Sequence, residues 1–208
     1  MSRLVNNLIR EGYLKTDNII DAFSEINRIE FVPAYLESQA EANIPLPIGY
    51  GQTISQPLTV AIMLELLNPQ RGQNILDVGS GSGWTTALLS YIVGEKGKVI
   101  ALERIPELCE FGKKNVDKYG FIKKGIAEMY CADGNKGFPK YSPYDRILVS
   151  AAVEDIPQPL KDQLKVGGKM VIPVHNDIWY LEKKEENDFY KEEFPGFSFV
   201  PLIEKSRD

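Results

Sequence analysis

Apolar residues recur at helical intervals over the first thirty positions of this chain and at strand-like intervals from residue 74 onward. Leu4, Leu8 and Ile9 share one helical face. A second face is formed by Ile19, Ile20, Phe23 and Ile26. We therefore predict two amphipathic helices at the N-terminus, the second with Asp17 as its N-cap.

The segment 44–57, IPLPIGYGQTISQP, contains three prolines and two glycines. Prolines and glycines at this frequency disfavour both a helix and a strand, so we predict a packed loop. A helix is expected to follow through Val60, Met63, Leu64 and Leu67. Because Ser55 precedes Gln56-Pro57, it is a candidate N-cap for that helix.

From residue 74 to residue 174, short apolar runs alternate with helical patterns. Predicted strands lie at 75–78, 99–103, within 129–134, at 145–150 and at 169–174, and predicted helices begin at Trp84, Pro106 and Gln158. The alternation is typical of an α/β fold with a mainly parallel sheet and helices on both faces. We expect a single domain over 1–208, with an N-terminal extension (1–56) and a core (57–208).

The remaining chain is less regular. Gly167-Gly168 and His175-Asn176-Asp177 are predicted turns, the latter because these residue types tolerate left-handed backbone. Ile178–Leu181 is predicted to be a strand, 182–188 a polar connection, and Phe197–Ile203 a last strand.

The strongest candidate for chemistry is the stretch NILDVGSGSGW, in which Asp77 precedes three alternate glycines, Gly79, Gly81 and Gly83. A glycine turn between a strand and a helix lets a ligand approach the backbone and the N–H groups of the helix terminus. The spacing differs from the dinucleotide pattern G-x-G-x-x-G. It resembles motif I of S-adenosylmethionine (AdoMet) methyltransferases.

Two later strand ends carry groups that suit a nucleoside. Glu103 ends the next predicted strand, 24 residues after Gly79, and a carboxylate there can accept both ribose hydroxyls. Asp133-Gly134 follows the third predicted strand. These three strand ends together predict a nucleoside pocket.

Composition narrows the functional classes. The net charge of −5, with 43% hydrophobic and 25% charged residues, is ordinary for a soluble domain. Basic residues are scattered among acids, which disfavours an extended nucleic-acid surface. No apolar run is long enough to span a membrane, and no secretory signal is apparent. We expect a cytoplasmic monomer without a metal site, in which Cys109 and Cys131 are small buried hydrophobes.

The chain resembles the protein-L-isoaspartate (D-aspartate) O-methyltransferase family. The resemblance rests on segments 45–57 (PLPIGYGQTISQP), 75–89, 97–108, 131–152, 160–174 and 199–202 (FVPL). Of these, GQTIS is the most family-specific, because class I methyltransferases share the glycine turn. The resemblance implies a Rossmann-like class I methyltransferase fold, AdoMet as cofactor and isoaspartyl peptides as substrates.

Residue roles follow from the same resemblance. Ser55 corresponds to the active-site serine, and Thr53, Ile54, Val200 and Leu202 to the substrate side. The cofactor side comprises Asp77, Gly79, Ser80, Gly81, Ser82, Gly83, Glu103, Asp133 and Gly134. Three positions depart from the family pattern and bear on peptide selectivity and the rim of the site: Asn43, His175 and Ile203. We interpret His175 as a turn residue rather than a base.

The implied reaction needs no general base, because a carboxylate with a pKa near ~4 is already ionised at neutral pH. Three alternatives to isoaspartyl repair remain. A related enzyme could methylate a different carboxylate in a dedicated peptide. A nucleic-acid amino-methyltransferase would resemble [D/N]-P-P-[F/Y] where this chain has Ser150-Ala151-Ala152-Val153. The last alternative is a non-catalytic AdoMet-binding module.

Overall fold

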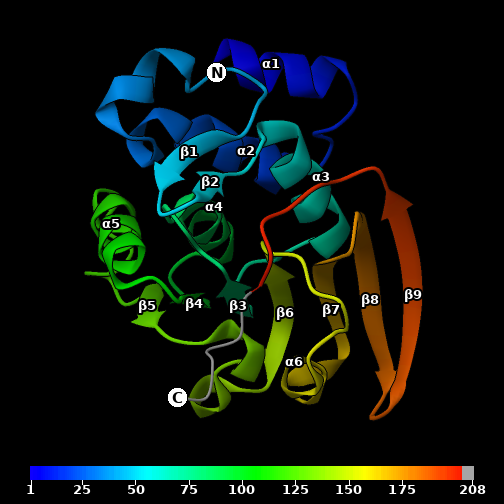
Figure 1. The fold of residues 1–208 in the computed structure, drawn as a ribbon. Coiled ribbons are helices and arrows are strands. Elements are labelled where there is room, and N and C mark those ends of the chain that lie inside the picture. The colour runs from blue at the N-terminus through cyan, green and yellow to red at the C-terminus, as the bar shows by residue number, and fades with distance from the viewer. Residues whose placement is uncertain (203–208) are drawn as a thin grey trace.

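The computed structural model describes residues 1–202 and is built on a seven-stranded sheet (Figure 1). Its strands are β3 (Asn74–Val78), β4 (Lys98–Glu103), β5 (Ala127–Cys131), β6 (Tyr144–Val149), β7 (Leu164–Val174), β8 (Asp177–Glu185) and β9 (Asp188–Pro195). The spatial order is β5-β4-β3-β6-β7-β8-β9, parallel through β7 and antiparallel at β8 and β9. The predicted mainly parallel α/β sheet is confirmed.

Helices lie on both faces of the sheet, although unevenly. The helices α3 (Pro57–Leu67), α4 (Trp84–Val93) and α5 (Pro106–Asp117) cover one face. The other is covered by α6 (Gln158–Asp162) and the short 3-10 turns η3 (Gly134–Lys136) and η4 (Pro139–Tyr141). Neighbouring residues such as Ile75 and Leu76 are fully buried on opposite faces, as expected for a parallel strand covered on both sides.

The N-terminal extension packs beside the carboxyl ends of the parallel strands (Figure 1, blue). It contains α1 (Arg3–Arg10), α2 (Asp17–Glu25), η1 (Arg28–Phe31) and η2 (Ala34–Gln39). Phe23 of α2 meets Trp84 of α4 edge to face, with ring centroids 5.6 Å apart. Both predicted helices are confirmed, but the N-cap is Thr16 rather than Asp17.

The predicted loop 44–57 is wrong in part, because it contains a hairpin of β1 (Leu46–Gly49) and β2 (Gln52–Ile54). The turn residues Tyr50 and Gly51 have φ of 54° and 70°, and positive φ at both positions suits a two-residue hairpin. Pro47 is tolerated because a two-stranded ribbon leaves one side of each strand unpaired.

The C-terminal third departs most from the predicted elements. Strand β7 begins at Leu164 and includes the predicted Gly167-Gly168 turn. The predicted polar connection 182–188 is instead the end of β8, a short turn and the start of β9. Strand β9 was not predicted, because an edge strand exposing most of its side chains lacks the apolar signal of a buried one.

The predicted last strand, Phe197–Ile203, is also wrong over the described residues. Residues 197–200 have no regular structure, and Pro201 forms only an isolated bridge with Ala152. Ile203 lies outside the described residues. This C-terminal segment, residues 196–202, leaves β9 and crosses the carboxyl ends of the central strands (Figure 1, red).

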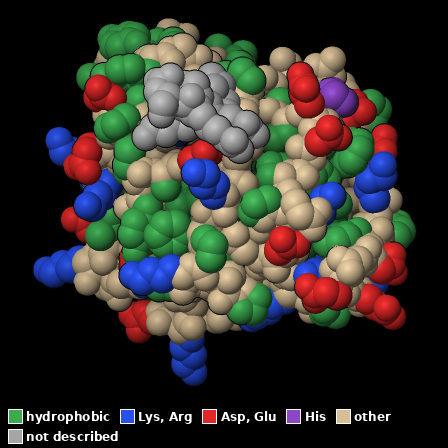
Figure 2. Space-filling model, turned by 60° about the horizontal axis from the view of Figure 1, so that its bottom comes forward, with side chains coloured by type: hydrophobic (Ala, Val, Ile, Leu, Met, Phe, Trp, Pro, Cys, Tyr) green, Lys and Arg blue, Asp and Glu red, His purple; other side chains and the backbone are tan. Residues whose placement is uncertain are grey.

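The predictions for His175 and the two cysteines are confirmed in part. His175 has φ of 52°, which confirms the predicted turn. Cys109 is buried as predicted, but Cys131 is exposed because it ends the edge strand β5. On the face shown in Figure 2, acidic and basic side chains are interspersed. Within residues 1–202, no helix is long and apolar enough to cross a membrane, and no three acidic, His or Cys side chains cluster as metal ligands do.

Candidate active site

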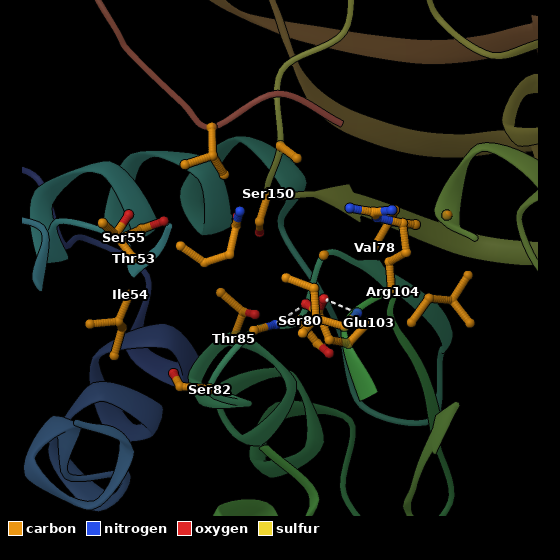
Figure 3. Close-up of a pocket in the computed structure, with 18 of the residues that line it drawn as sticks. Thr53, Ile54, Ser55, Val78, Ser80, Ser82, Thr85, Glu103, Arg104 and Ser150 are labelled. Atoms are coloured by element: carbon orange, nitrogen blue, oxygen red, sulfur yellow. Dashed lines mark hydrogen bonds between the residues drawn. The ribbon is translucent and has the colours of Figure 1, made fainter. Parts of the chain in front are cut away.

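A pocket opens at the carboxyl ends of β3, β4 and β6, facing the β1–β2 hairpin. Figure 3 shows the hairpin residues on one side, with Val78 and Arg104 on the other and Ser80, Thr85 and Glu103 between them. Of the residues predicted for the site, those that line it are Thr53, Ile54, Ser55, Gly79, Ser80, Gly81, Ser82, Glu103, Gly134, Val200 and Leu202. Asp77, Gly83 and Asp133 lie outside the lining.

The glycine turn forms the floor of this pocket. Gly79, Gly81 and Gly83 have φ of 78°, 51° and 87°, a backbone that residues with a side chain rarely adopt. A Cβ at Gly81 would stand 3.3 Å from the Ile48 side chain of the hairpin, and one at Gly83 would stand 2.8 Å from the Gly112 carbonyl oxygen. Gly81 therefore keeps the floor open, whereas Gly83 lets α4 approach α5.

Asp77 is fully buried beneath the turn rather than in the pocket. Its Oδ2 accepts hydrogen bonds from the hydroxyls of Thr85 and Thr86, at 2.9 and 2.7 Å. Burial raises the pKa of Asp77 to about 6, the two threonine hydrogen bonds oppose that shift, and the Glu103 charge adds to it. The carboxylate thus ties strand β3 to the first turn of α4 and shapes the glycine turn from below.

Glu103 stands at the end of β4, beside the turn. Its Oε2 accepts from the Gly81 N–H at 3.0 Å, and its Oε1 accepts from the Ile105 N–H at 2.9 Å. A carboxylate offers about four acceptor sites, so both oxygens retain capacity for ligand hydroxyls. Two backbone contacts orient the group before any ligand binds.

Asp133 and Gly134 have different roles in the structure. The Asp133 side chain accepts from the Asn135 N–H at 3.0 Å and caps η3, so it does not line the pocket. Gly134 does line it, and a Cβ there would fall 2.4 Å from a Val78 methyl. The glycine is required by close packing against β3, and Ala132 supplies the neighbouring wall.

Ser55 lies where the pocket meets a second cavity, between the hairpin and the C-terminal segment. The two cavities share Thr53, Ser55, Ser150 and Val200. Within residues 1–202 the Ser55 hydroxyl has no hydrogen-bond partner. It is not the cap of α3, because Gln56 occupies that position and Asn43 Oδ1 accepts from the Leu58 N–H at 3.0 Å.

The C-terminal segment closes the wall opposite the hairpin. The Ala152 N–H donates to the Val200 carbonyl oxygen at 2.8 Å, and the Leu202 N–H donates to the Ala152 carbonyl oxygen at 2.7 Å. These bonds hold Val200 and Leu202 against the loop that follows β6. Part of the backbone of this segment is therefore already paired with the protein.

Sequence reasoning missed several lining residues. Ile48, Trp84, Arg104, Ser150 and Ala151 all face the pocket. Ser150 and Ala151 were detectable, because Ser150 ends the fourth predicted strand, just as Glu103 ends the second, and Ala151 comes directly after it. Ile48 was not detectable, since its place depends on the hairpin folding back over Gly81.

The residues present fit AdoMet. The floor is made of glycines, so no Cβ atom stands where a ligand must approach the backbone. The carboxylate of Glu103, already oriented by backbone N–H groups, lies at the end of the neighbouring strand. The buried Ser80 hydroxyl has no partner among the described residues, although it lines the pocket. An unpaired buried hydroxyl of this kind is suited to a polar ligand.

Comparison with known proteins decides the family. The family model described as protein-L-isoaspartate(D-aspartate) O-methyltransferase matches residues 1–207. This chain belongs to that family. A protein-L-isoaspartate O-methyltransferase of Methanopyrus kandleri is 45% identical over 97% of this chain and 90% of its own length. One from Pyrococcus horikoshii is 45% identical over 97% of this chain and 91% of its own.

Solved structures agree with the family assignment. A Plasmodium falciparum protein described as a protein-L-isoaspartate O-methyltransferase, in complex with S-adenosyl-L-homocysteine, superposes with a TM-score of 0.86 at 25% identity. It covers 96% of both chains. Another protein-L-isoaspartate O-methyltransferase superposes with a TM-score of 0.88 at 30% identity, covering 97% of this chain and 65% of that one. The fold is the Rossmann-like class I methyltransferase fold, and this family member is an AdoMet-dependent O-methyltransferase.

Proposed function

We propose that this protein transfers a methyl group from AdoMet to the carboxylate of L-isoaspartyl and D-aspartyl residues in damaged proteins. The observation that carries the proposal is the position of Ser55. Its hydroxyl, free of protein partners within residues 1–202, stands between the cofactor pocket and the second cavity. A donor placed there can orient a carboxylate toward the methyl group without attacking it.

The cofactor is assigned to the first pocket by chemistry. The methionine part would lie over Gly79–Gly83, where Ser80 and Ser82 are available to its polar groups. Glu103 would accept from the ribose hydroxyls, and Ala132 and Gly134 would border the adenine. Trp84 and Thr85 complete the floor at the start of α4.

Methyl transfer needs little from the protein beyond alignment and exclusion of water. AdoMet supplies an electrophilic methyl group on a sulfonium. The substrate carboxylate oxygen bonds to the methyl carbon, the carbon–sulfur bond breaks, and its electron pair stays on sulfur. The products are a neutral ester and a neutral thioether, so no proton moves. The walls contribute by holding oxygen, carbon and sulfur in line and by desolvating the nucleophile.

The ester then leads to repair without further catalysis. The backbone nitrogen of the following substrate residue attacks the ester carbonyl, and methanol leaves. The resulting succinimide takes up water and opens in part to normal aspartate. The enzyme therefore needs only to methylate the damaged carboxylate and release the product.

Substrate selection is geometric. Isoaspartyl and aspartyl residues carry the same charge, so attraction to the site cannot separate them. They differ in the carbon from which the backbone leaves the carboxylate. Pro45 and Thr53 line the second cavity at the hairpin, and residues 196–200 of the C-terminal segment line it as well. Pro45, Pro47 and Pro201 stiffen these two segments. Stiff walls lower the ordering cost of binding.

The charge of the protein surface bears on where the protein acts and on what it binds. The sequence pI of about 5.1 and the dispersed charges suit neither a nucleic-acid nor an anionic membrane partner. We propose a cytoplasmic monomer that meets its substrates as exposed peptide segments.

The test is transfer of tritiated methyl from AdoMet to matched peptides that contain isoaspartate, D-aspartate or L-aspartate at one position. We expect methylation of the first, slower methylation of the second and almost none of the third. Equal rates on isoaspartyl and aspartyl peptides would instead favour an enzyme for a dedicated carboxylate. AdoMet binding by calorimetry without any transfer would identify a non-catalytic module.

A further inference from the structure

Arg28 is buried next to the active site without an acidic partner. The residue is 4% exposed, and within residues 1–202 no carboxylate forms an ion pair with its guanidinium. Instead Nη1 donates to the carbonyl oxygens of Ala40 and Ala42, at 2.9 and 3.3 Å. Nη2 donates to those of Ile44 and Ser55, at 2.9 and 3.1 Å. Burial lowers the pKa of Arg28 to about 10, so the group remains charged at neutral pH.

The four acceptors lie at both ends of one segment. Residues 40–44 lead into the hairpin, and Ser55 is the first residue after it. A single guanidinium therefore closes the chain from 40 to 55 into a loop. Because the Ser55 carbonyl is held, its peptide plane and the direction of its side chain are restrained.

The same guanidinium contacts the cofactor side. Its Cζ lies 5.4 Å from the centre of the Trp84 ring, a cation–π arrangement. Trp84 is the first residue of α4, directly after Gly83, and it lines the AdoMet pocket. Trp84 also forms the wall of another cavity, into which Arg28 faces. Arg28 thus touches the substrate loop and the cofactor helix at once.

We propose that Arg28 is a positioning residue, which sets the distance between Ser55 and the glycine turn. The inference rests on the proposed function, since it assigns Ser55 to the substrate carboxylate. The planar guanidinium fork reaches four carbonyls that an ammonium on a single stem cannot bridge. An apolar residue would leave those carbonyls unpaired.

The primary test is Arg28→Lys, which keeps the charge and three donors. Arg146→Lys is the matched control. Arg146 is 9% exposed and its guanidinium also donates to backbone carbonyls, those of Asn68 and Asp145. Unlike Ser55 and Trp84, which Arg28 contacts, these two partners line neither the AdoMet pocket nor the second cavity. We expect Arg28→Lys to lower kcat on an isoaspartyl peptide about 10- to 100-fold, because a small misplacement of a reacting group is costly. AdoMet affinity by calorimetry should stay within about twofold, because the cofactor contacts remain.

The control should lower the melting temperature and leave kcat within about twofold, since no residue that Arg146 holds lines either cavity. Equal losses of kcat in the two lysine variants would overturn the proposal. A loss of AdoMet affinity in Arg28→Lys that matches the loss of kcat would do so as well.

A double variant tests the route through Ser55. If Arg28 acts by placing that hydroxyl, Ser55→Ala should remove most of the further effect of Arg28→Lys on kcat. Losses that multiply in full would show that the two residues act separately, and the proposal would fail. As a second approach, Arg28→Ala should be rescued by added guanidinium and not by urea at the same concentration. A folded Arg28→Ala without rescue would also count against it.

Amide hydrogen exchange separates this inference from the proposed function. In Arg28→Lys, amides of residues 44–56 should exchange faster than in Arg146→Lys, whereas those of α5 should not change. Unaltered exchange at 44–56 would overturn the positioning role even in an active enzyme. If wild type transfers no methyl to isoaspartyl peptides, the proposed function fails, and exchange at 44–56 still decides whether Arg28 holds this loop.

Discussion

The two sides of the active site are built in different ways. The cofactor side is local: the Gly83 N–H donates to the Ser80 carbonyl oxygen within the turn, and the Gly79 and Ser80 N–H groups donate to the Leu102 carbonyl oxygen of the adjacent strand. The substrate side is assembled from distant parts of the chain. Arg28 holds Ser55, Asn43 caps the helix that follows, and Ala152 holds the C-terminal segment.

Because of this difference, we expect substitutions on the cofactor side and on the substrate side to have different consequences. A substitution in the glycine turn acts on a backbone that few residues can adopt, so we expect it to affect cofactor binding directly. The substrate walls depend on many contacts that are individually weak, and each can shift a little without disturbing the turn. We therefore expect peptide preference to be easier to change by substitution than cofactor binding.

The largest expected effect is on the cofactor side. Gly81→Val should weaken AdoMet binding about 1,000-fold, because it places a branched side chain at φ of 51° on the pocket floor, against Ile48. Calorimetry measures it. Gly125→Val is the control, since Gly125 has φ of 71° but open space around its Cβ position. It carries the backbone strain alone and should bind AdoMet normally. Retained affinity in Gly81→Val would remove the turn from the cofactor site.

A second prediction concerns the buried carboxylate that supports the turn. The pKa of Asp77 is raised to about 6 by burial, above its ordinary value of 3.8. The folded state then holds a proton more tightly than the unfolded state, and stability falls as pH rises between these values. The difference in unfolding free energy between wild type and Asp77→Asn should drop by about 2 kcal/mol from pH 4 to pH 6. Urea titrations at several pH values test this. A difference that is flat or rising would contradict it.

The smallest expected effects distinguish two residues of the substrate side, Ser55 and Asn43. Ser55→Ala should lower turnover and leave the melting temperature unchanged, because Ser55 does not cap α3. Asn43→Ala should cost ~1 kcal/mol of stability, because Asn43 accepts from the Leu58 N–H at the start of that helix. Turnover per folded molecule should fall less in Asn43→Ala than in Ser55→Ala. The reverse pattern would return Ser55 to a structural role.

The same contrast explains what could be predicted from the sequence. Buried parallel strands and the glycine turn carry strong local signals, and the elements around Asp77 and Glu103 were placed correctly. The hairpin was not, because its strands are three and four residues long and its prolines suggested a loop. Its conformation depends on Arg28, which no local pattern links to Ser55.

Two further errors have a related cause. Strand β9 exposes most of its side chains, so the alternation that marks a half-buried strand is faint. The segment from Phe197 has apolar residues at strand-like spacing, yet it pairs with Ala152 over only a few atoms. In both places the pairing partner decides the structure, and the partner lies elsewhere in the chain.

The two ends of the β8–β9 hairpin differ in how closely they are connected to the active site. At its base, the N–H groups of Gly196 and Phe197 donate to the Asn176 carbonyl oxygen and fix where the chain turns toward the active site. At its tip, Asn187 is exposed and lies far along the ribbon from that anchor, whereas the neighbouring Glu186 pairs with the buried Lys183. An affinity tag or a fluorophore grafted at the tip would leave the reaction untouched, whereas one residue added at the base would displace a wall of the active site.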